Sequence, residues 1–400
     1  MKDRWTYTVD NAFALAFFKR IHLNGWYEHH QDPTTSQLCE TCKTSRIMAE
    51  RFERVVRVSD LKDMGKQCEL CKMIWQSVDS TVTNGDEVVR IHRKDSNLWV
   101  KGRDRPILRV CAGLKAPELI QIGFPALPDV RSDIYFELIR EWLRVCDRDH
   151  ADYGCRPGHN PRLPTRVLQV SNHSTSLHLH CAKPNERGRY LALSHCWGKL
   201  PSDVKEMSCT YRRNFEDRCV EIDISTLPRN FQDAILVTRK LGIQYIWIDS
   251  LCIIQDDLRD WEKEAKLMEQ VFSSAYCTIA ASSAKDSTVG FLSAREPAPF
   301  VRVPYTSKSC LFVCEAMDDF HRDVGLGELN TRAWVLQERA LSRRTLHFTK
   351  TQTYWECGRG IHCESMTKLN KYVIHCLLPI SLAPMFATLL TALLYELDLW

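Results

Sequence analysis

The sequence predicts an α/β fold with a parallel sheet, preceded by a mixed N-terminal region. Two apolar segments that end in polar residues, 190–198 and 245–249, are predicted to be strands, and an amphipathic helix lies between them. A second amphipathic segment and a short apolar one, 276–281, follow. Strands that alternate with helices are typical of parallel sheets, which present polar side chains at the carboxyl ends of their strands.

Local signals place the elements around these strands. Ser225 or Thr226 is a suitable cap for the first helix, and Gly242 lies where a helix commonly ends. The second helix is predicted to begin at Asp256 or Asp257, because carboxylates stabilise the N-terminus of a helix. We predict four regions, namely an N-terminal region 1–150, a linker 151–165, a region 166–357 that holds the strongest motifs, and a tail 358–400.

The composition is that of a globular protein with a sizeable core. The chain has 400 residues, of which 44% are hydrophobic and 26% charged. Its net charge of +4 is too small to favour nucleic acid or an anionic membrane as a partner. The apolar stretch 12–18 follows the acidic Asp10 and is followed by Lys19 and Arg20, which does not fit a secretory signal. Most of the 18 cysteines are therefore predicted to be free and buried, or bound to metal.

The tail contains one apolar segment of unusual length. Residues 372–395 contain no Asp, Glu, Lys or Arg and are long enough to span a bilayer, although two prolines weaken that interpretation. A truncated or misread gene end would also produce such a segment. We therefore predict a cytoplasmic protein, with membrane anchoring or contact through 372–395 as the alternative.

Two C-x-x-C pairs lie in the N-terminal region, Cys39 with Cys42 and Cys68 with Cys71. Four thiolates are the usual closed ligand set of structural zinc, so the pairs predict that these cysteines converge on one zinc ion. The alternative is two helices with buried cysteines, because the segment that starts at Cys68 is also amphipathic.

Glu264 is the most unusual residue of the second helix. At about 100° per residue it falls within the apolar stripe formed by Trp261, Met268 and Phe272, while the other charged side chains point elsewhere. A buried carboxylate must be paired or shifted in pKa. The two interpretations are a structural ion pair, with Arg332 or Arg339 as the partner, and a ligand-facing or catalytic Glu.

The polar residues that end the strands suggest a crevice. His195, Trp197 and Asp249 are the candidates to line it, and Asp249 can also cap a helix or orient a histidine. Ser194, His195 and Cys196 do not form a nucleophile with its base, because neighbours on a strand point to opposite faces.

Seven blocks of the second region resemble the fungal heterokaryon incompatibility (HET) domain. They follow one another in order as YLALSHCWG (190–198), LPRNFQDA (227–234), YIWIDSLCIIQD (245–256), DWEKE (260–264), VFSSAY (271–276), DSTVGF (286–291) and TRAWVLQE (331–338). So many blocks in register make the resemblance highly specific over 190–338. The C-x-x-C segment is similar to the N-terminal part that such proteins often carry.

The resemblance implies an effector of non-self recognition in filamentous fungi, whose activation leads to programmed cell death. It implies protein partners or self-association through the HET domain, and no nucleic acid is expected. HET domains have been likened to TIR domains, some of which cleave NAD with a Glu, and Trp261 with Glu264 is similar to that sequence context. Two further function classes are therefore a NAD-cleaving enzyme that uses Glu264, with NAD as its substrate, and a zinc-dependent regulatory or DNA-binding protein.

Overall fold

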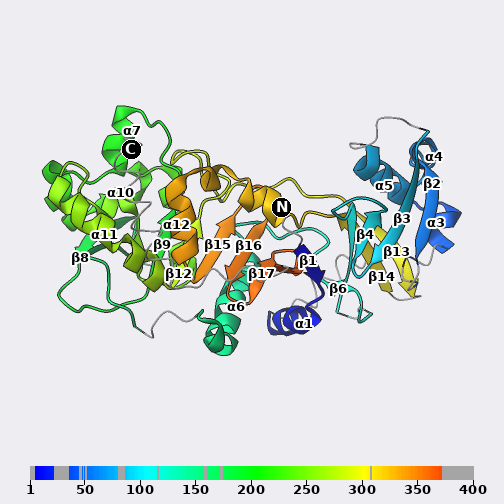
Figure 1. Ribbon diagram of the computed structural model, residues 1–400, viewed down its shortest axis with the longest axis horizontal. Helices are drawn as coiled ribbons and strands as arrows, with labels where there is room; N and C mark the ends of the chain where they lie inside the picture. Colours follow the sequence, from blue (N-terminus) through cyan, green and yellow to red (C-terminus); the bar gives the residue numbers. More distant parts are fainter. Residues whose placement is uncertain are drawn as a thin grey trace.

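The computed structural model describes residues 5–21, 36–44, 47, 49, 52–79, 86–114, 117–155, 160–171, 174–306 and 309–371. The described chain forms two lobes that follow one another along the long axis of the molecule, each built on one β-sheet (Figure 1). The apolar segment 372–395 lies outside the described residues. Among the helices that the structure does describe, none is both long and apolar enough to cross a bilayer.

The larger lobe contains a sheet of 11 strands. In spatial order these are β1 (Trp5–Thr8), β18 (Lys368–Lys371), β17 (Gly360–Cys363), β16 (Thr353–Cys357), β15 (Arg344–Phe348), β12 (Cys277–Ala280), β9 (Tyr190–Ser194), β11 (Tyr245–Trp247), β7 (Arg166–Val170), β8 (Ser176–Cys181) and β10 (Ile222–Asp223).

The centre of this sheet is parallel and its two flanks are antiparallel. Strands β9 and β11 are parallel neighbours with Tyr190 opposite Tyr245, as predicted, and β12 and β15 continue the parallel part. The prediction of a parallel sheet was wrong for the flanks, where β7 runs antiparallel to β11 and β15 to β18 form an antiparallel meander. The short connections between β7 and β8 and along β15 to β18 permit only antiparallel pairing, since a parallel pair needs a long crossover.

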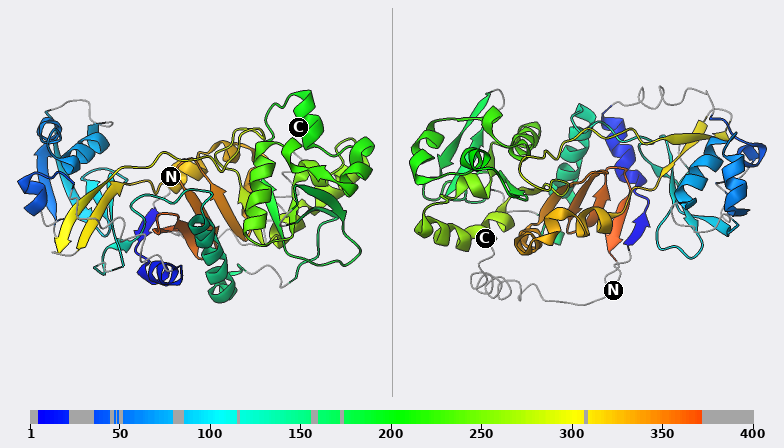
Figure 2. Two further views of the ribbon diagram at one scale, coloured as in Figure 1. Left: turned by 180° about the vertical axis from the view of Figure 1, so that it is seen from behind. Right: turned by 90° about the horizontal axis from the view of Figure 1, so that it is seen from above.

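Helices cover both faces of the sheet (Figures 1 and 2). On one face, Tyr190 Oη donates to the carbonyl of Val271 in α11 (Leu258–Ser274), and α12 (Ala333–Leu341) lies beside that helix. On the other, the Tyr135 hydroxyl of α6 (Asp133–Asp149) bonds the Thr353 hydroxyl of β16, and α9 (Arg229–Lys240) packs on β7 and β11. The other described helices of this lobe are α1 (Asn11–Arg20), α7 (Ser202–Ser208), α8 (Phe215–Val220) and α10 (Asp249–Cys252).

Two predicted helix starts have different outcomes. Asp257 caps α11 as predicted, since its carboxylate accepts from the backbone N–H groups of Arg259 and Asp260. The predicted cap at Ser225 or Thr226 was wrong, because these residues form a 3₁₀ turn (Ile224–Thr226) capped by Asp223. Helix α9 begins at Arg229, directly after Pro228, whose fixed φ suits a helix start.

The smaller lobe contains a sheet of seven strands. Six follow the order β13 (Phe300–Thr306), β14 (Ser309–Glu315), β5 (Leu108–Ala112), β4 (Asn97–Val100), β3 (Val88–Lys94) and β2 (Glu53–Arg57), and β6 (Gln121–Ile122) pairs with β5. Helices α3 (Glu40–Thr44), α4 (Val58–Met64) and α5 (Glu69–Asp79) belong to this lobe.

Each of the two sheets contains strands from both the predicted N-terminal region 1–150 and the predicted region 166–357. Strands β13 and β14 come from the region predicted at 166–357, yet β14 pairs with β5 of the smaller lobe. Conversely, β1 and α6 come from the first 150 residues and belong to the larger lobe. The predicted boundaries at 150 and 166 stay predictions, and both lobes contain segments from each side of them.

Candidate functional site

The carboxyl ends of β9 and β11 bring three predicted site residues together. Trp197 Nε1 donates to Asp249 Oδ2 over 2.8 Å, and His195 Nδ1 lies 3.9 Å from Asp249 Oδ1. The same carboxylate accepts from the backbone N–H of Ser250 at 2.7 Å. Strand β11 ends at Trp247, so the prediction that Asp249 ends the strand was wrong. Asp249 opens the short helix α10, whose turn its carboxylate stabilises.

His195 lies deep in the protein. It is 4% exposed, its ring packs edge-on against Phe231 of α9 with centroids 5.1 Å apart, and no described residue hydrogen-bonds to its Nε2. Burial lowers its pKa, which Asp249 partly offsets. His195 lies beneath α9, whereas Ser194 lies on the side of α12, where it hydrogen-bonds with Glu338. Burial raises the pKa of the Cys196 thiol. The opposite orientation of strand neighbours explains this arrangement.

Hydrogen bonds to backbone groups join several of the sequence blocks into one polar network. The N–H of Ser287 donates to the carbonyl of Trp197, and the N–H of Asn230 donates to the carbonyl of Ser287. Arg332 Nη1 donates to the carbonyl of His195 at 3.0 Å. Segments as far as 137 residues apart in the chain thus hold one another in place around the end of β9.

Glycines allow these segments to approach closely. Gly198 has φ +73°, and a Cβ there would lie 2.2 Å from Cβ of Asp286. A Cβ on Gly290 would lie 2.5 Å from Oδ2 of Asp233, a buried carboxylate that accepts from the N–H of Leu292. Glycine at position 198 is therefore required both by its backbone conformation and by the close packing of Asp286.

Glu338 of α12 is a site residue that sequence reasoning missed. Burial raises the pKa of its carboxyl to about 7, although a hydrogen bond with Ser194 and the charge of Arg332 act in the opposite direction. The block TRAWVLQE, which ends at Glu338, is part of the resemblance to the HET domain, and this was the available sign that Glu338 belongs to the site. The sequence of a short helix does not indicate which strand the helix packs on, so the contact between Glu338 and Ser194 could not be predicted.

Residues on three neighbouring strands line a small cavity beneath α12. Ser194, Ala280 and His347 lie side by side on β9, β12 and β15, and together with Arg339 of α12 they line a cavity of about 10 Å³. His347 Nε2 lies 2.8 Å from Glu356 Oε2, and Arg339 makes two hydrogen bonds of 3.0 Å to the same carboxylate. The cavity has room for about one water molecule.

Glu264 is buried as predicted, with 2% of its surface exposed, but the predicted ion-pair partners were wrong. Its Oε1 lies 3.8 Å from Arg166 Nη2, and the same guanidinium pairs with Asp260. Arg166 Nε also donates to the carbonyl of Cys252 at 2.6 Å. Arg166 lies near Glu264 because β7 runs antiparallel to β11, which brings the start of β7 to the end of β11. Burial raises the pKa of Glu264.

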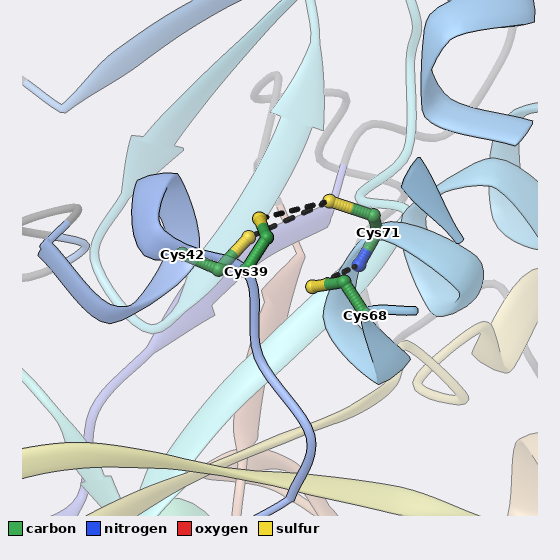
Figure 3. Close-up of side chains that lie close together, drawn as sticks. All are labelled: Cys39, Cys42, Cys68 and Cys71. Carbon is green, nitrogen blue, oxygen red and sulfur yellow. Dashed lines mark hydrogen bonds between the residues drawn. The ribbon is translucent and has the colours of Figure 1, made fainter. Parts of the chain in front are cut away.

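In the smaller lobe, the four cysteines of the C-x-x-C pairs converge as predicted. The sulfur atoms of Cys39, Cys42, Cys68 and Cys71 all lie within 4.8 Å of one another, three of them on buried residues (Figure 3). Cys39 and Cys68 each precede a helix, α3 and α5, whose first turns carry Cys42 and Cys71. The arrangement fits a metal ion, and the thiolate set is the one that structural zinc uses.

Hydrogen bonds to sulfur organise this thiol group. The N–H of Cys71 donates to Cys68 Sγ at 3.4 Å, and Arg54 of β2 donates to Cys42 Sγ and Cys71 Sγ at 3.5 Å each. The N–H of Glu69 bonds the carbonyl of Gln37 at 2.8 Å and so joins the two C-x-x-C segments. Arg54 supplies positive charge beside a group that becomes anionic when its thiols ionise.

A second group of metal-ligand type, Cys146, His150, Cys155 and Cys357, lies in the larger lobe within the described residues. This group was not predicted from the sequence. Cys146 and His150 are one helical turn apart, which is a usable signal, but Cys357 is remote in the chain.

Fold and site together define a mixed α/β protein with two Cys/His groups that can hold a metal ion. Residues 190–338 match the Heterokaryon incompatibility protein (HET) family, so this part of the chain is a HET domain. The sequence resemblance to this family is thus confirmed. No curated protein and no solved structure matches the chain. The likeness to TIR domains stays a prediction.

Proposed function

We propose that this protein is a cytoplasmic incompatibility effector of a filamentous fungus, which triggers programmed cell death after non-self recognition. The observation that carries the proposal is the HET match over 190–338. The contacts among its blocks support it, since Trp197, Asn230 and Ser287 hold one another through backbone hydrogen bonds. We further propose that the HET domain acts through protein partners or self-association.

The geometry at the strand ends supports assembly more than chemistry on a small molecule. The cavity beside Ser194 has a volume of about 10 Å³, and pockets for small molecules usually measure 300–1,000 Å³. His195 is covered by Phe231 of α9. A substrate would therefore require a rearrangement of α9 or α12.

The alternative of a NAD-cleaving enzyme depends on Glu264. Its carboxylate lies beside the Arg166 guanidinium, which also pairs with Asp260. An ion pair that joins β7 to α11 is a structural role, and removal of one partner of a buried pair costs about 3–5 kcal/mol. Zinc in the smaller lobe, held by Cys39, Cys42, Cys68 and Cys71, is proposed to stabilise that lobe rather than to bind DNA.

Induced expression in a filamentous fungus tests the proposal. The full chain, Glu264→Gln and the exposed control Glu221→Gln are compared for growth arrest at equal protein level, and the purified proteins are assayed for loss of NAD. We expect the wild type and the control to kill, with NAD unchanged by the purified wild type. A wild type that accumulates without affecting growth would overturn the effector proposal.

The NAD assay separates the two enzyme outcomes. NAD loss caused by the wild type and abolished in a folded Glu264→Gln variant would establish the NAD-cleaving alternative instead. If Glu264 is structural, the variant loses stability and killing together, and thermal unfolding of the purified variant shows this directly.

A further inference from the structure

The group Cys146, His150, Cys155 and Cys357 gathers four donor atoms from three separate segments. Each residue offers one ligand atom, and all four atoms lie within 4.8 Å of one another. Cys146 and His150 come from the end of α6 and the residue that follows it, Cys155 follows the 3₁₀ turn Ala151–Tyr153, and Cys357 is the last residue of β16. In a tetrahedral zinc site with Zn–S bonds of about 2.3 Å, neighbouring sulfur atoms lie roughly 3.8 Å apart. The observed spread therefore needs little adjustment to close around one ion.

The surroundings of these residues are those of a built site. Cys146 is 0% exposed, Cys155 1% and His150 8%. His150 Nδ1 lies 3.5 Å from Cys357 Sγ, so this imidazole nitrogen faces the thiols. The backbone N–H of Gly358 donates to Cys155 Sγ at 3.3 Å, as the N–H of Cys71 does to Cys68 Sγ in the other thiol group.

Gly358 and Arg344 hold the Cys155 segment in place. A Cβ at position 358 would lie 2.4 Å from the carbonyl oxygen of Tyr153 and 3.1 Å from Cys155 Sγ, so the close approach requires glycine. Arg344 is 1% exposed, donates from Nε to the carbonyl of Cys155 at 2.8 Å and pairs with Asp147 at 2.7 Å. Three thiolates and a neutral imidazole around Zn²⁺ leave one negative charge, and the guanidinium of Arg344, which is shared with Asp147, lies beside this group.

Ordinary burial of cysteines explains the arrangement less well. The same chain contains a simple buried pair, Cys111 and Cys314, whose sulfur atoms lie 3.9 Å apart on adjacent strands. The four-residue group differs because a histidine and three thiols from distant segments point to one centre. A disulfide would use two of the thiols and leave the third thiol and the imidazole unexplained.

We propose that Cys146, His150, Cys155 and Cys357 bind one zinc ion as a closed structural Cys₃His site. The ion joins the end of α6 and the start of the predicted linker to β16, next to which the HET sheet continues through β15. It therefore closes a chain segment of roughly 200 residues and makes the packing of α6 on the HET sheet dependent on metal. This site is independent of the function proposed above.

The metal content of the purified full chain tests the proposal. Native mass spectrometry and elemental analysis should show two zinc ions per chain, one for each thiol group. Cys357→Ser should lose one ion, and Cys71→Ser should lose the other. The matched control is Cys310→Ser, a strand cysteine of similar half-buried exposure outside both groups, which should keep two.

X-ray absorption at the zinc edge of the wild type provides a test that does not depend on the folding of the Cys357→Ser variant. One Cys₄ and one Cys₃His site predict an average of 3.5 sulfur and 0.5 nitrogen ligands per zinc, and His150→Cys should raise this to four sulfurs with two zinc ions retained. A wild type with one zinc in an all-sulfur environment, lost in Cys71→Ser, would overturn the proposal. A disulfide between any two of the three cysteines, found by peptide mapping under non-reducing conditions, would also overturn it.

Discussion

The indole N–H of Trp197 donates to the carboxylate of Asp249 over 2.8 Å and so ties the end of β9 to the start of α10. Strands β9 and β11 are already neighbours in the sheet, and their last ladder pair is Ala192 with Trp247. The hydrogen bond fixes the two loops where the sheet no longer does. The charge on Asp249 strengthens it relative to a bond between neutral groups.

Trp197→Phe should lower the free energy of unfolding by about 1–2 kcal/mol, because it removes the donor but keeps most of the apolar surface. A double-mutant cycle with Asp249→Asn in urea unfolding should give a coupling energy of about 1 kcal/mol. The matched cycle of Trp197→Phe with Asp133→Asn, on a different helix, should be additive. Additivity in the Asp249 cycle would show that the contact does not stabilise the protein.

Gly198→Ala and Gly242→Ala form a matched pair with different expected costs. Both glycines have positive φ, +73° and +69°, so both substitutions carry the cost of a left-handed residue, about 1–2 kcal/mol. At Gly242 a Cβ meets nothing within 4 Å, whereas at Gly198 it would lie 2.2 Å from Cβ of Asp286. Overpacking adds about 1–3 kcal/mol. Thermal or urea unfolding should therefore show a clearly larger loss for Gly198→Ala, and equal losses would contradict the packing described here.

Glu338 should make stability fall as the pH rises. Burial raises the pKa of its carboxyl in the folded protein from 4.5 to about 7, so the folded state holds this proton more tightly than the unfolded state. Its contribution is present in full below pH 4.5 and is lost as the pH rises through 7. The effect is on the order of 3 kcal/mol. In Glu338→Gln this dependence should vanish, so the variant gains stability relative to wild type between pH 4.5 and 8.

Glu356 provides the control of opposite sign. Burial alone would raise its pKa, but hydrogen bonds from His347 and the paired Arg339 outweigh burial and lower the pKa to about 2. Its contribution is therefore present above pH 4.5 and is lost as the pH falls towards 2. Urea unfolding of Glu356→Gln should show its largest loss near neutral pH. If the two variants show the same trend with pH, the assignment of Glu338 is wrong.

Arg54→Met should weaken metal binding by the four C-x-x-C cysteines. Arg54 donates to Cys42 Sγ and Cys71 Sγ at 3.5 Å each, and loss of such outer contacts typically lowers metal affinity 10- to 100-fold. Competition with a chromogenic zinc chelator measures the change. Arg90→Met is the control, because Arg90 pairs with Glu53 on the neighbouring strand. An unchanged zinc affinity in Arg54→Met would show that the guanidinium does not support the site.

The sequence by itself determined the features that depend on neighbours in the chain. The alternation of β9, α9, β11 and α11 follows from local apolar periodicity and from caps such as Asp257. The burial of Glu264 follows from helical spacing alone, because a helix fixes which residues share a face. Within each C-x-x-C pair, the spacing along the chain places the two cysteines close together, and four such thiols are the ligand set of structural zinc, which predicted a common centre.

The tertiary structure decided which distant segments meet. Glu264 is paired with Arg166 because β7 runs antiparallel to β11, and strand direction is not encoded in the helix that carries Glu264. Glu338 lies over Ser194 only once α12 has packed on the sheet. Cys357 joins Cys146 and His150 because β16 lies beside α6. Such contacts depend on sheet order and on the packing of helices against it, which arise from the burial of the whole apolar surface rather than from any local pattern.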